Sequence, residues 1–100
     1  MKLYLIKTIC IIKDPNTLDE IWNHTTDAVV TDLQVAMTII HNNACDLSEE
    51  GYNKYAGILE IETGLYPIGE ELAWYVWDKQ EQRYVSCDRP EILYGYCLTI

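Results

Sequence analysis

The sequence predicts an α+β fold, in which an antiparallel sheet of four to six strands carries one main helix on one face. Strand-like segments rich in β-branched and aromatic residues occupy residues 2–12 and much of 55–87, and turn-forming residues separate them. One stretch between them, within residues 27–42, has the spacing of an amphipathic helix. A chain of 100 residues that is 49% apolar can bury one core, so we expect a single domain spanning residues 1–100.

The first predicted strand, residues 2–12, is apolar on both faces, which is typical of a central strand covered on two sides. Lys7 interrupts the run, and residues 13–15 end it without the small-residue site at which a signal peptide is cut. The run is also too short to cross a bilayer. We therefore interpret it as the first strand of a mature domain.

The segment after this strand allows two interpretations. Residues 14–17 predict a turn, because Pro, Asp and Asn favour tight local backbone geometry. Residues 18–23 form either a short strand that pairs with the first one or a helical turn, and we favour the strand. Residues 24–27 are polar and typical of a loop.

The predicted helix has two candidate starting points. It begins either near Asp27, capped by a threonine just before it, or near Asp32, where Thr31 and Gln34 match a capping box. Apolar residues three and four apart give it one buried face. We expect it to end at about His41 or Asn42, because the following asparagines tolerate the left-handed backbone conformation.

The second half of the chain predicts three antiparallel strands after an acidic connector. A longer loop joins the first two strands, because Pro67 cannot donate a hydrogen bond to a sheet. A polar hairpin joins the last two. The connector spans residues 46–51, the strands span 56–62, 71–78 and 84–87, and the longer loop spans 63–70.

The strand at residues 71–78 is apolar on both faces, so both faces must be covered. We expect Trp74 to lie in the core under the helix. Tyr75 and Trp77 would then lie on the opposite face, as an interface or a ligand shelf. The apolar segment 94–100 also needs a partner, either at a sheet edge or in a neighbouring subunit.

The charge balance is acidic, with 16 Asp and Glu residues against 7 Lys and Arg residues and a net charge of −9. Such a chain repels nucleic acids and anionic membranes, so we expect neither direct nucleic-acid binding nor membrane binding. The acidity either keeps a small protein in solution or forms a surface that docks on a basic partner. The sequence leaves both interpretations open.

No catalytic, metal-binding or cofactor motif stands out, so we expect a protein that is not an enzyme and uses no cofactor. The four cysteines form no Cys-x-x-Cys pair, and we interpret them as reduced thiols of a cytoplasmic protein. Disulfides remain an alternative because the count is even. We expect Cys87 to serve packing, and His24 and His41 to have no catalytic role.

The candidate partner-binding residues are carboxylates, which would steer the protein onto a basic partner, and aromatic side chains, which would anchor it. The wider acidic series also includes Asp46, Glu49 and Glu50. Trp and Tyr are frequent among the residues that dominate binding energy at interfaces. The candidate set is Glu60, Glu62, Tyr66, Glu70, Glu71, Tyr75 and Trp77.

Three stretches resemble small accessory proteins encoded by phages and prophages of Gram-positive bacteria. They are Tyr55-Ala-Gly-Ile-Leu-Glu-Ile-Glu-Thr-Gly-Leu-Tyr-Pro67, Trp74-Tyr-Val-Trp77 and Arg89-Pro-Glu91. The resemblance covers roughly the last half of the chain and transfers no catalytic residue. It implies an accessory protein of a mobile element, a class that includes anti-CRISPR and other anti-defence inhibitors.

Together, these observations lead to the hypothesis of a protein that inhibits a host nucleic-acid-processing complex by protein–protein contact. The partner would be a basic host protein or ribonucleoprotein complex in the cytoplasm of a bacterial cell. Neutralising Glu60, Glu62, Glu70 and Glu71 would then weaken binding. The alternative hypotheses are a homo-oligomer that sequesters a nucleotide signal between subunits and a structural or regulatory phage protein without a host target.

Overall fold

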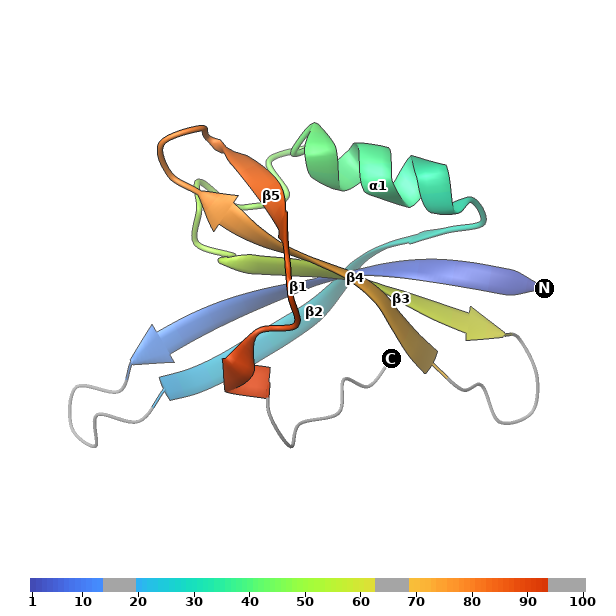
Figure 1. Ribbon diagram of the computed structural model, residues 1–100, viewed down its shortest axis with the longest axis horizontal. Helices are drawn as coiled ribbons and strands as arrows, with labels where there is room; N and C mark the ends of the chain where they lie inside the picture. Colours follow the sequence, from blue (N-terminus) through green and yellow to red (C-terminus); the bar gives the residue numbers. More distant parts are fainter. Residues whose placement is uncertain (14–19, 63–68, 94–100) are drawn as a thin grey trace.

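The structure, a computed structural model, describes the backbone of residues 1–13, 20–62 and 69–93. These residues form one five-stranded antiparallel sheet, one α-helix and a short 3-10 helix (Figure 1). The α+β prediction is confirmed. In chain order the elements are β1 (Lys2–Lys13), β2 (Glu20–Val30), α1 (Leu33–His41), β3 (Tyr55–Glu62), β4 (Gly69–Asp78), β5 (Arg83–Cys87) and η1 (Glu91–Leu93).

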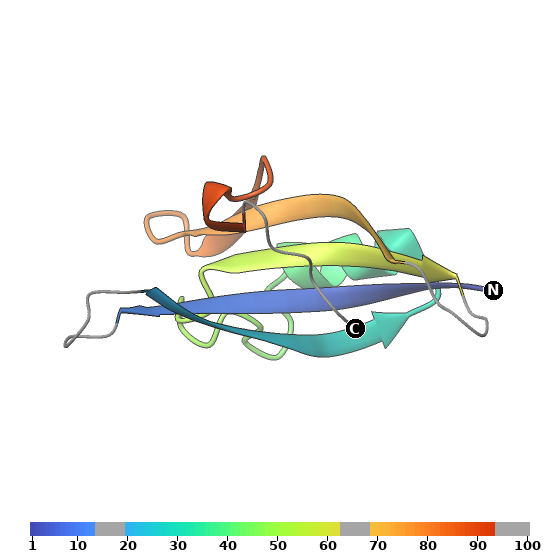
Figure 2. The same cartoon turned by 90° about the horizontal axis from the view of Figure 1, so that it is seen from below.

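The strands lie in the order β2-β1-β3-β4-β5, and each strand is antiparallel to its neighbours. Figure 2 shows this order from β5 and β4 at the top to β2 at the bottom. The prediction that the first strand is central is confirmed, because β1 lies between β2 and β3. The predicted turn at 14–17, most of the loop at 63–70 and the segment at 94–100 lie outside the described residues.

The favoured strand at residues 18–23 is confirmed from Glu20 onward, but β2 continues to Val30. The prediction of a loop at residues 24–27 is therefore wrong. These residues pair with β1, with Thr25 opposite Thr8 and Thr26 opposite Lys7. Backbone pairing with the central strand overrides the local loop preference of polar residues.

The helix start near Asp27 is also wrong, and the later start is close to the observed one. Asp32 is the N-cap of α1, and its carboxylate accepts a hydrogen bond from the backbone N–H of Gln34 at 2.7 Å. The cap is thus Asp32 rather than Thr31. The predicted end is confirmed, since Asn42 is the C-cap.

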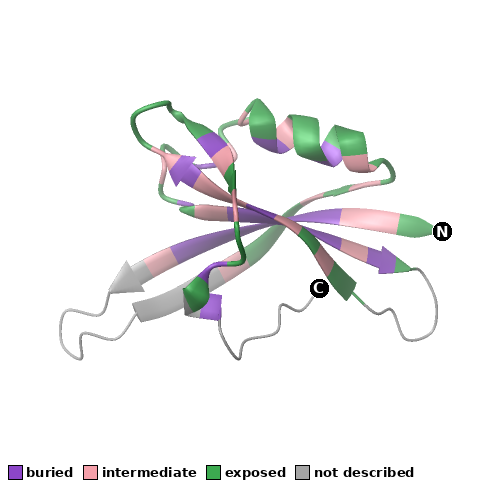
Figure 3. Ribbon diagram, in the orientation of Figure 1, coloured by how far each residue is buried: buried purple, intermediate pink, exposed green. Residues whose placement is uncertain are grey.

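The main core lies between α1 and one face of the sheet, which we call the helix-side face. Trp77 and Tyr84 meet there edge to face, with ring centroids 5.2 Å apart. Trp77 is only 9% exposed, so the expectation of an exposed Trp77 on the opposite face is wrong. The buried residues of this cluster are Ile6, Ala36, Ile40, Ala56, Ile58, Trp77 and Tyr84 (purple in Figure 3).

Trp74 lies on the far face of the sheet, so its predicted place under the helix is wrong. It packs with Ile9 and Leu93. Its ring lies over Gly57 of the neighbouring strand, where an added Cβ would come within 2.8 Å of the ring. Strand alternation correctly separates Trp74 from Trp77, but it does not tell which of the two faces the helix covers.

The far face carries two smaller apolar clusters, so both faces of β1 are buried, as predicted. Leu5 and Leu59 form the centre of one cluster, and Ile9 and Trp74 belong to the other. Lys7 also points to this face and is buried, with its Nζ donating to the Thr26 hydroxyl at 2.6 Å. Burial lowers the pKa of Lys7.

The loop between α1 and β3, residues 42–54, is tied to the sheet by a backbone hydrogen bond from Trp77 N–H to the Lys54 carbonyl at 2.8 Å and by a buried bond from a side chain. The Tyr84 hydroxyl donates to the backbone carbonyl of Asn53 at 2.6 Å. The Asn53 side chain in turn donates to the Leu47 carbonyl at 3.0 Å. Burial raises the pKa of Tyr84, so the phenol stays protonated and keeps this bond.

We expect Tyr84→Phe to lower the free energy of unfolding by about 1–2 kcal/mol at neutral pH, because the buried Asn53 carbonyl loses its donor. The raised pKa adds a pH dependence. The stabilisation that the protonated Tyr84 hydroxyl contributes is fully present below about pH 10, the pKa of tyrosine in the unfolded chain. It is lost as the pH rises through the higher pKa of Tyr84 in the folded protein. Urea unfolding between neutral pH and about pH 11 measures both effects.

The matched control is Tyr75→Phe. Tyr75 lies half-buried on the same helix-side face, and its hydroxyl has no hydrogen bond to another described residue. We expect a smaller loss of stability from this variant. Equal losses in the two variants would contradict the role of the Tyr84–Asn53 bond.

Candidate functional site

The loop of residues 42–54 makes tight turns in which Asp46, Glu49 and Glu50 are exposed, and the Asp46 carboxylate accepts a hydrogen bond from the Glu50 N–H at 3.2 Å. Several of its non-glycine residues have positive φ angles, between 46° at Asn43 and 61° at Glu50. Short backbone hydrogen bonds hold the turns, including Asp46 N–H to Asn43 O at 3.0 Å and Glu49 N–H to Asp46 O at 2.9 Å. The Asn43 side chain accepts from the Ser48 N–H at 2.8 Å and fixes the middle of the loop.

A bulge in β2 brings Asp27 to the same region. The register between β1 and β2 shifts after Ile6, so that Asp27 has no partner residue in β1. Its carboxylate accepts hydrogen bonds from the Thr8 hydroxyl and, at 3.2 Å, from the Thr25 hydroxyl. Both hydroxyls lie on the helix-side face, so the bulge directs Asp27 toward the loop.

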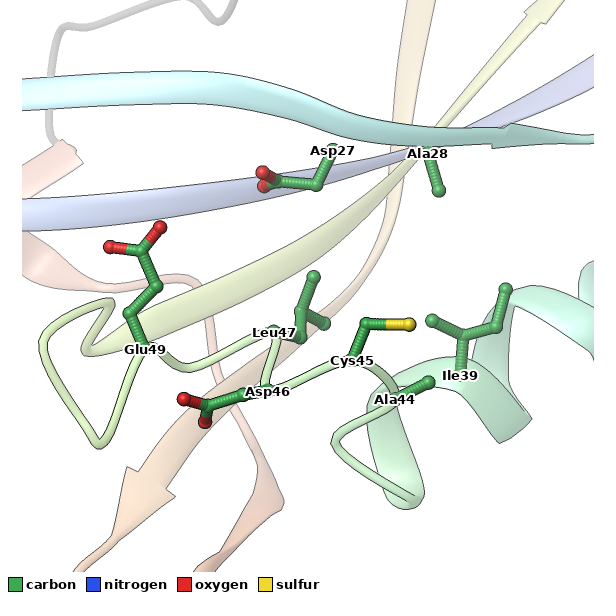
Figure 4. Close-up of a pocket in the computed structure, with 8 residues that line it drawn as sticks. All are labelled: Asp27, Ala28, Ile39, Ala44, Cys45, Asp46, Leu47 and Glu49. Atoms are coloured by element: carbon green, nitrogen blue, oxygen red, sulfur yellow. The ribbon is translucent and has the colours of Figure 1, made fainter.

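β2, the end of α1 and the loop enclose a cavity of about 360 Å³, which we call the acidic cleft. Figure 4 shows the carboxylates of Asp27, Asp46 and Glu49 gathered at one end and the side chains of Ala28, Ile39 and Ala44 at the other. The cleft therefore joins a negative end to an apolar one. Its lining residues are Asp27, Ala28, Ile39, Ala44, Cys45, Asp46, Leu47 and Glu49.

The three carboxylates of the acidic cleft act together electrostatically. After burial, the charges of Asp27, Asp46 and Glu49 are the next causes that raise the pKa of Tyr84. Among the described residues, no ion pair involves any of them. The ion pairs among the described residues involve Glu60, Glu62 and Glu71, which do not line the cleft.

This arrangement suits the binding of a cation with an apolar stem. A lysine or arginine side chain could pack its methylene groups on the apolar end and place its charge among the carboxylates. Cys45 supplies a thiol to the cleft, and no histidine is among the described residues that line it. Within the described ranges, no group of three potential ligands is arranged to hold a metal ion.

The structure groups three of the predicted partner-binding carboxylates at another part of the sheet. Glu60 and Glu70 are cross-strand partners, and Glu62 follows on the same face of β3. Two of these charges are already compensated. Glu60 pairs with Lys2 Nζ at 3.3 Å, and Glu62 pairs with the N-terminal amine at 3.0 Å.

The other predicted residues do not join this group. Glu71 points to the far face, where it accepts from Arg89 Nε at 2.7 Å and from Trp74 Nε1 at 2.9 Å. Tyr75 is half-buried and faces the helix, Trp77 is buried in the core, and Tyr66 lies outside the described residues. The predicted set therefore does not form one continuous surface among the described residues.

Asp27 and Cys45 were absent from the predicted site. Asp46 and Glu49 belonged to the acidic series but not to the candidate set. The sequence predicts a loop at Asp27, and nothing in the neighbouring sequence indicates the bulge that turns its side chain toward Asp46 and Glu49, about 20 positions away. The cleft forms only in the tertiary structure, and no short sequence motif predicts it.

The described cysteines, Cys10, Cys45 and Cys87, have free thiols in different surroundings. Cys87 is half-buried against the cluster of Trp74 and Leu93, and burial raises its pKa, in agreement with a packing role. Cys10 is buried and Cys45 is exposed in the acidic cleft. No helix in the described residues is long and apolar enough to cross a membrane.

We expect the carboxylates of the cleft to slow the reaction of Cys45 with an anionic reagent. The measurement compares the rate of thiol modification by the anionic disulfide dithiobis-nitrobenzoate with the rate for neutral dithiodipyridine. The kinetic phase that is absent in Cys45→Ser belongs to Cys45. Glu49→Gln should raise the ratio of anionic to neutral rates about twofold at low salt, because it removes a nearby like charge. Glu50→Gln, whose residue does not line the cleft, is the control.

An unchanged rate ratio in Glu49→Gln would contradict the electrostatic description of the cleft. So would an equal increase in Glu50→Gln, because that result would reflect only the net charge of the protein. High salt should remove the difference in this rate ratio between the variants.

Comparisons of this chain with models of protein families, with curated proteins and with solved structures gave no match.

Proposed function

We propose that this protein is a non-enzymatic inhibitor that binds a basic protein partner through the acidic cleft. The observation that carries the proposal is the cleft itself. It holds three carboxylates that form no ion pair with a described residue, beside an apolar wall. A cationic side chain from a partner would supply the missing charge.

An arginine or lysine side chain fits both ends of the cleft. Its methylene stem can bury apolar area against Ile39 and Leu47, and its head can form charge-assisted hydrogen bonds with the carboxylates. The carboxylates remain accessible, since Asp27, Asp46 and Glu49 are exposed. The net charge of −9 would add long-range attraction and speed the encounter with a basic surface.

A nucleic-acid-processing complex is the partner class that we propose. Surfaces that bind phosphates are rich in Lys and Arg, so an acidic protein that occupies one competes directly with nucleic acid. The resemblance to phage accessory proteins supports the same class, in the form of a host defence complex of the CRISPR type. Inhibition would then arise from occupancy of the basic surface and would need no chemical step.

We expect Glu49→Gln to weaken binding of a labelled hexa-arginine peptide about fivefold at low salt, because one ion pair in a partly exposed site contributes about 1 kcal/mol. Glu50→Gln is the matched control. It removes the same charge from the adjacent exposed residue, which does not line the cleft. Fluorescence anisotropy at low and high salt measures both affinities.

Equal affinities of the two variants would contradict binding in the cleft. A triple variant, Glu60→Gln with Glu62→Gln and Glu70→Gln, tests the carboxylate group on the sheet. Weaker peptide binding by this variant than by Glu49→Gln would move the site to that group.

The inhibitory part of the proposal has its own test. Wild-type protein should retain a basic protein complex from bacterial lysate at low salt and release it at high salt, and Glu49→Gln should retain less of this complex than Glu50→Gln does. The captured complex should lose its nucleic acid when wild-type protein is added. Capture without competition against nucleic acid would contradict inhibition by occupancy.

A further inference from the structure

A second cavity, of about 330 Å³, lies at the other end of the 42–54 loop. It is formed by the last residues of this loop, the end of β4 and the turn between β4 and β5, with one residue of β1. We call it the lysine–tryptophan pocket. Its lining residues are Ile11, Gly51, Tyr52, Lys54, Trp77 and Lys79.

Trp77 contributes a hydrogen-bond donor to this pocket. Its side chain is more than nine-tenths buried, and its Nε1–Cδ1 edge lies against Gly51. The indole N–H forms no hydrogen bond with another described residue. Nε1 itself keeps some exposure to solvent, so the N–H can donate to a ligand in the pocket.

Gly51 is what lets the indole edge reach the pocket. Its φ angle is +89°, a conformation that favours glycine, and an added Cβ would lie 2.8 Å from Trp77 Nε1. Any other residue would cover the donor. The close approach of backbone and indole leaves the N–H edge beside the cavity.

The pocket is positive in an otherwise acidic protein. Lys54 and Lys79 supply two of the seven Lys and Arg residues of the whole chain. No carboxylate is among the described residues that line the pocket, and neither lysine forms an ion pair with a described residue. Lys54 Nζ lies 5.4 Å from the centre of the ring of Tyr55, the residue that follows it in the chain.

We infer that the lysine–tryptophan pocket binds a small ligand that carries an anionic group beside a planar ring, of the size of a nucleoside monophosphate. The two ammonium groups would hold the anion, and the Trp77 N–H would donate to an acceptor of the ligand. The Tyr52 ring, which is 59% exposed, offers a face on which the ligand's ring can stack. The volume lies at the lower end of the range for small-molecule sites.

This site is independent of the acidic cleft, since no residue lines both cavities. It is formed by residues of one chain. Binding there would therefore require no second subunit, in contrast to the hypothesis of a ligand held between subunits. Loss of binding at one site would leave the other site intact.

The test is a titration of the ¹⁵N-labelled protein with adenosine monophosphate, followed through the assigned indole N–H signal of Trp77. We expect this signal to shift in a saturable way and the indole signal of Trp74, whose N–H is bonded to Glu71, to stay unchanged. No saturable shift of the Trp77 signal up to about 10 mM ligand would overturn the inference.

Two variants separate the pocket from general electrostatics. Lys79→Gln should weaken binding about fivefold, because one charge-assisted contact is lost. Arg83→Gln is the matched control, since it removes a positive charge at the other side of the same turn and does not line the pocket. Equal effects of the two variants would overturn the assignment of the site.

The two halves of the ligand are tested with adenosine and inorganic phosphate. Each should bind more weakly than the monophosphate by about tenfold or more, because each makes only part of the contacts. Adenosine binding as tightly as the monophosphate would overturn the role of the lysines. Inorganic phosphate binding as tightly would overturn the role of the ring.

Discussion

The hydrogen bond from the Tyr84 hydroxyl to the Asn53 carbonyl connects the sheet to the loop that lines both cavities. It connects β5 to the long loop between α1 and β3, and it is buried beside Trp77. That loop lines both cavities, the acidic cleft near its start and the lysine–tryptophan pocket near its end. Hydrogen bonds within the loop hold its turns, and the bond from Tyr84 adds a fixed point on the sheet.

The sheet beneath this loop is buried on two unequal faces. The nine-residue helix α1 covers one face, where the larger core forms around Ile6, Ile58 and Trp77. The far face carries smaller clusters, to which η1 adds Leu93. Arg89 holds η1 near the sheet, because it donates to Glu71 and to the Leu93 carbonyl at 2.7 Å each. The acidic residue Glu71 thus has a structural role on that face.

The loop of residues 42–54 carries negative charges near its start and a positive charge at its end. Asp46 and Glu49 stand at the acidic cleft without a cationic partner among the described residues, whereas Lys54 belongs to the lysine–tryptophan pocket a few residues later. The carboxylates Glu60 and Glu62 are partly compensated by Lys2 and the N-terminal amine. The acidity is therefore most available at the cleft, which favours a cationic partner there and an anionic ligand at the other end of the loop.

The sequence by itself predicted the single helix, the central place of β1 and the strands of the second half, because alternating and continuous apolar patterns report local periodicity and burial directly, but it predicted a loop where β2 continues through residues 24–27. It also separated Trp74 from Trp77 correctly. Only the tertiary structure decided which of these two residues lies under the helix, since the alternation of side chains along a strand does not indicate which face of the sheet the helix covers. The same limit applies to the site. Asp27 meets Asp46 and Glu49 because pairing with β1 extends β2 through a polar stretch and a bulge turns one carboxylate toward the loop, and no local pattern encodes that meeting.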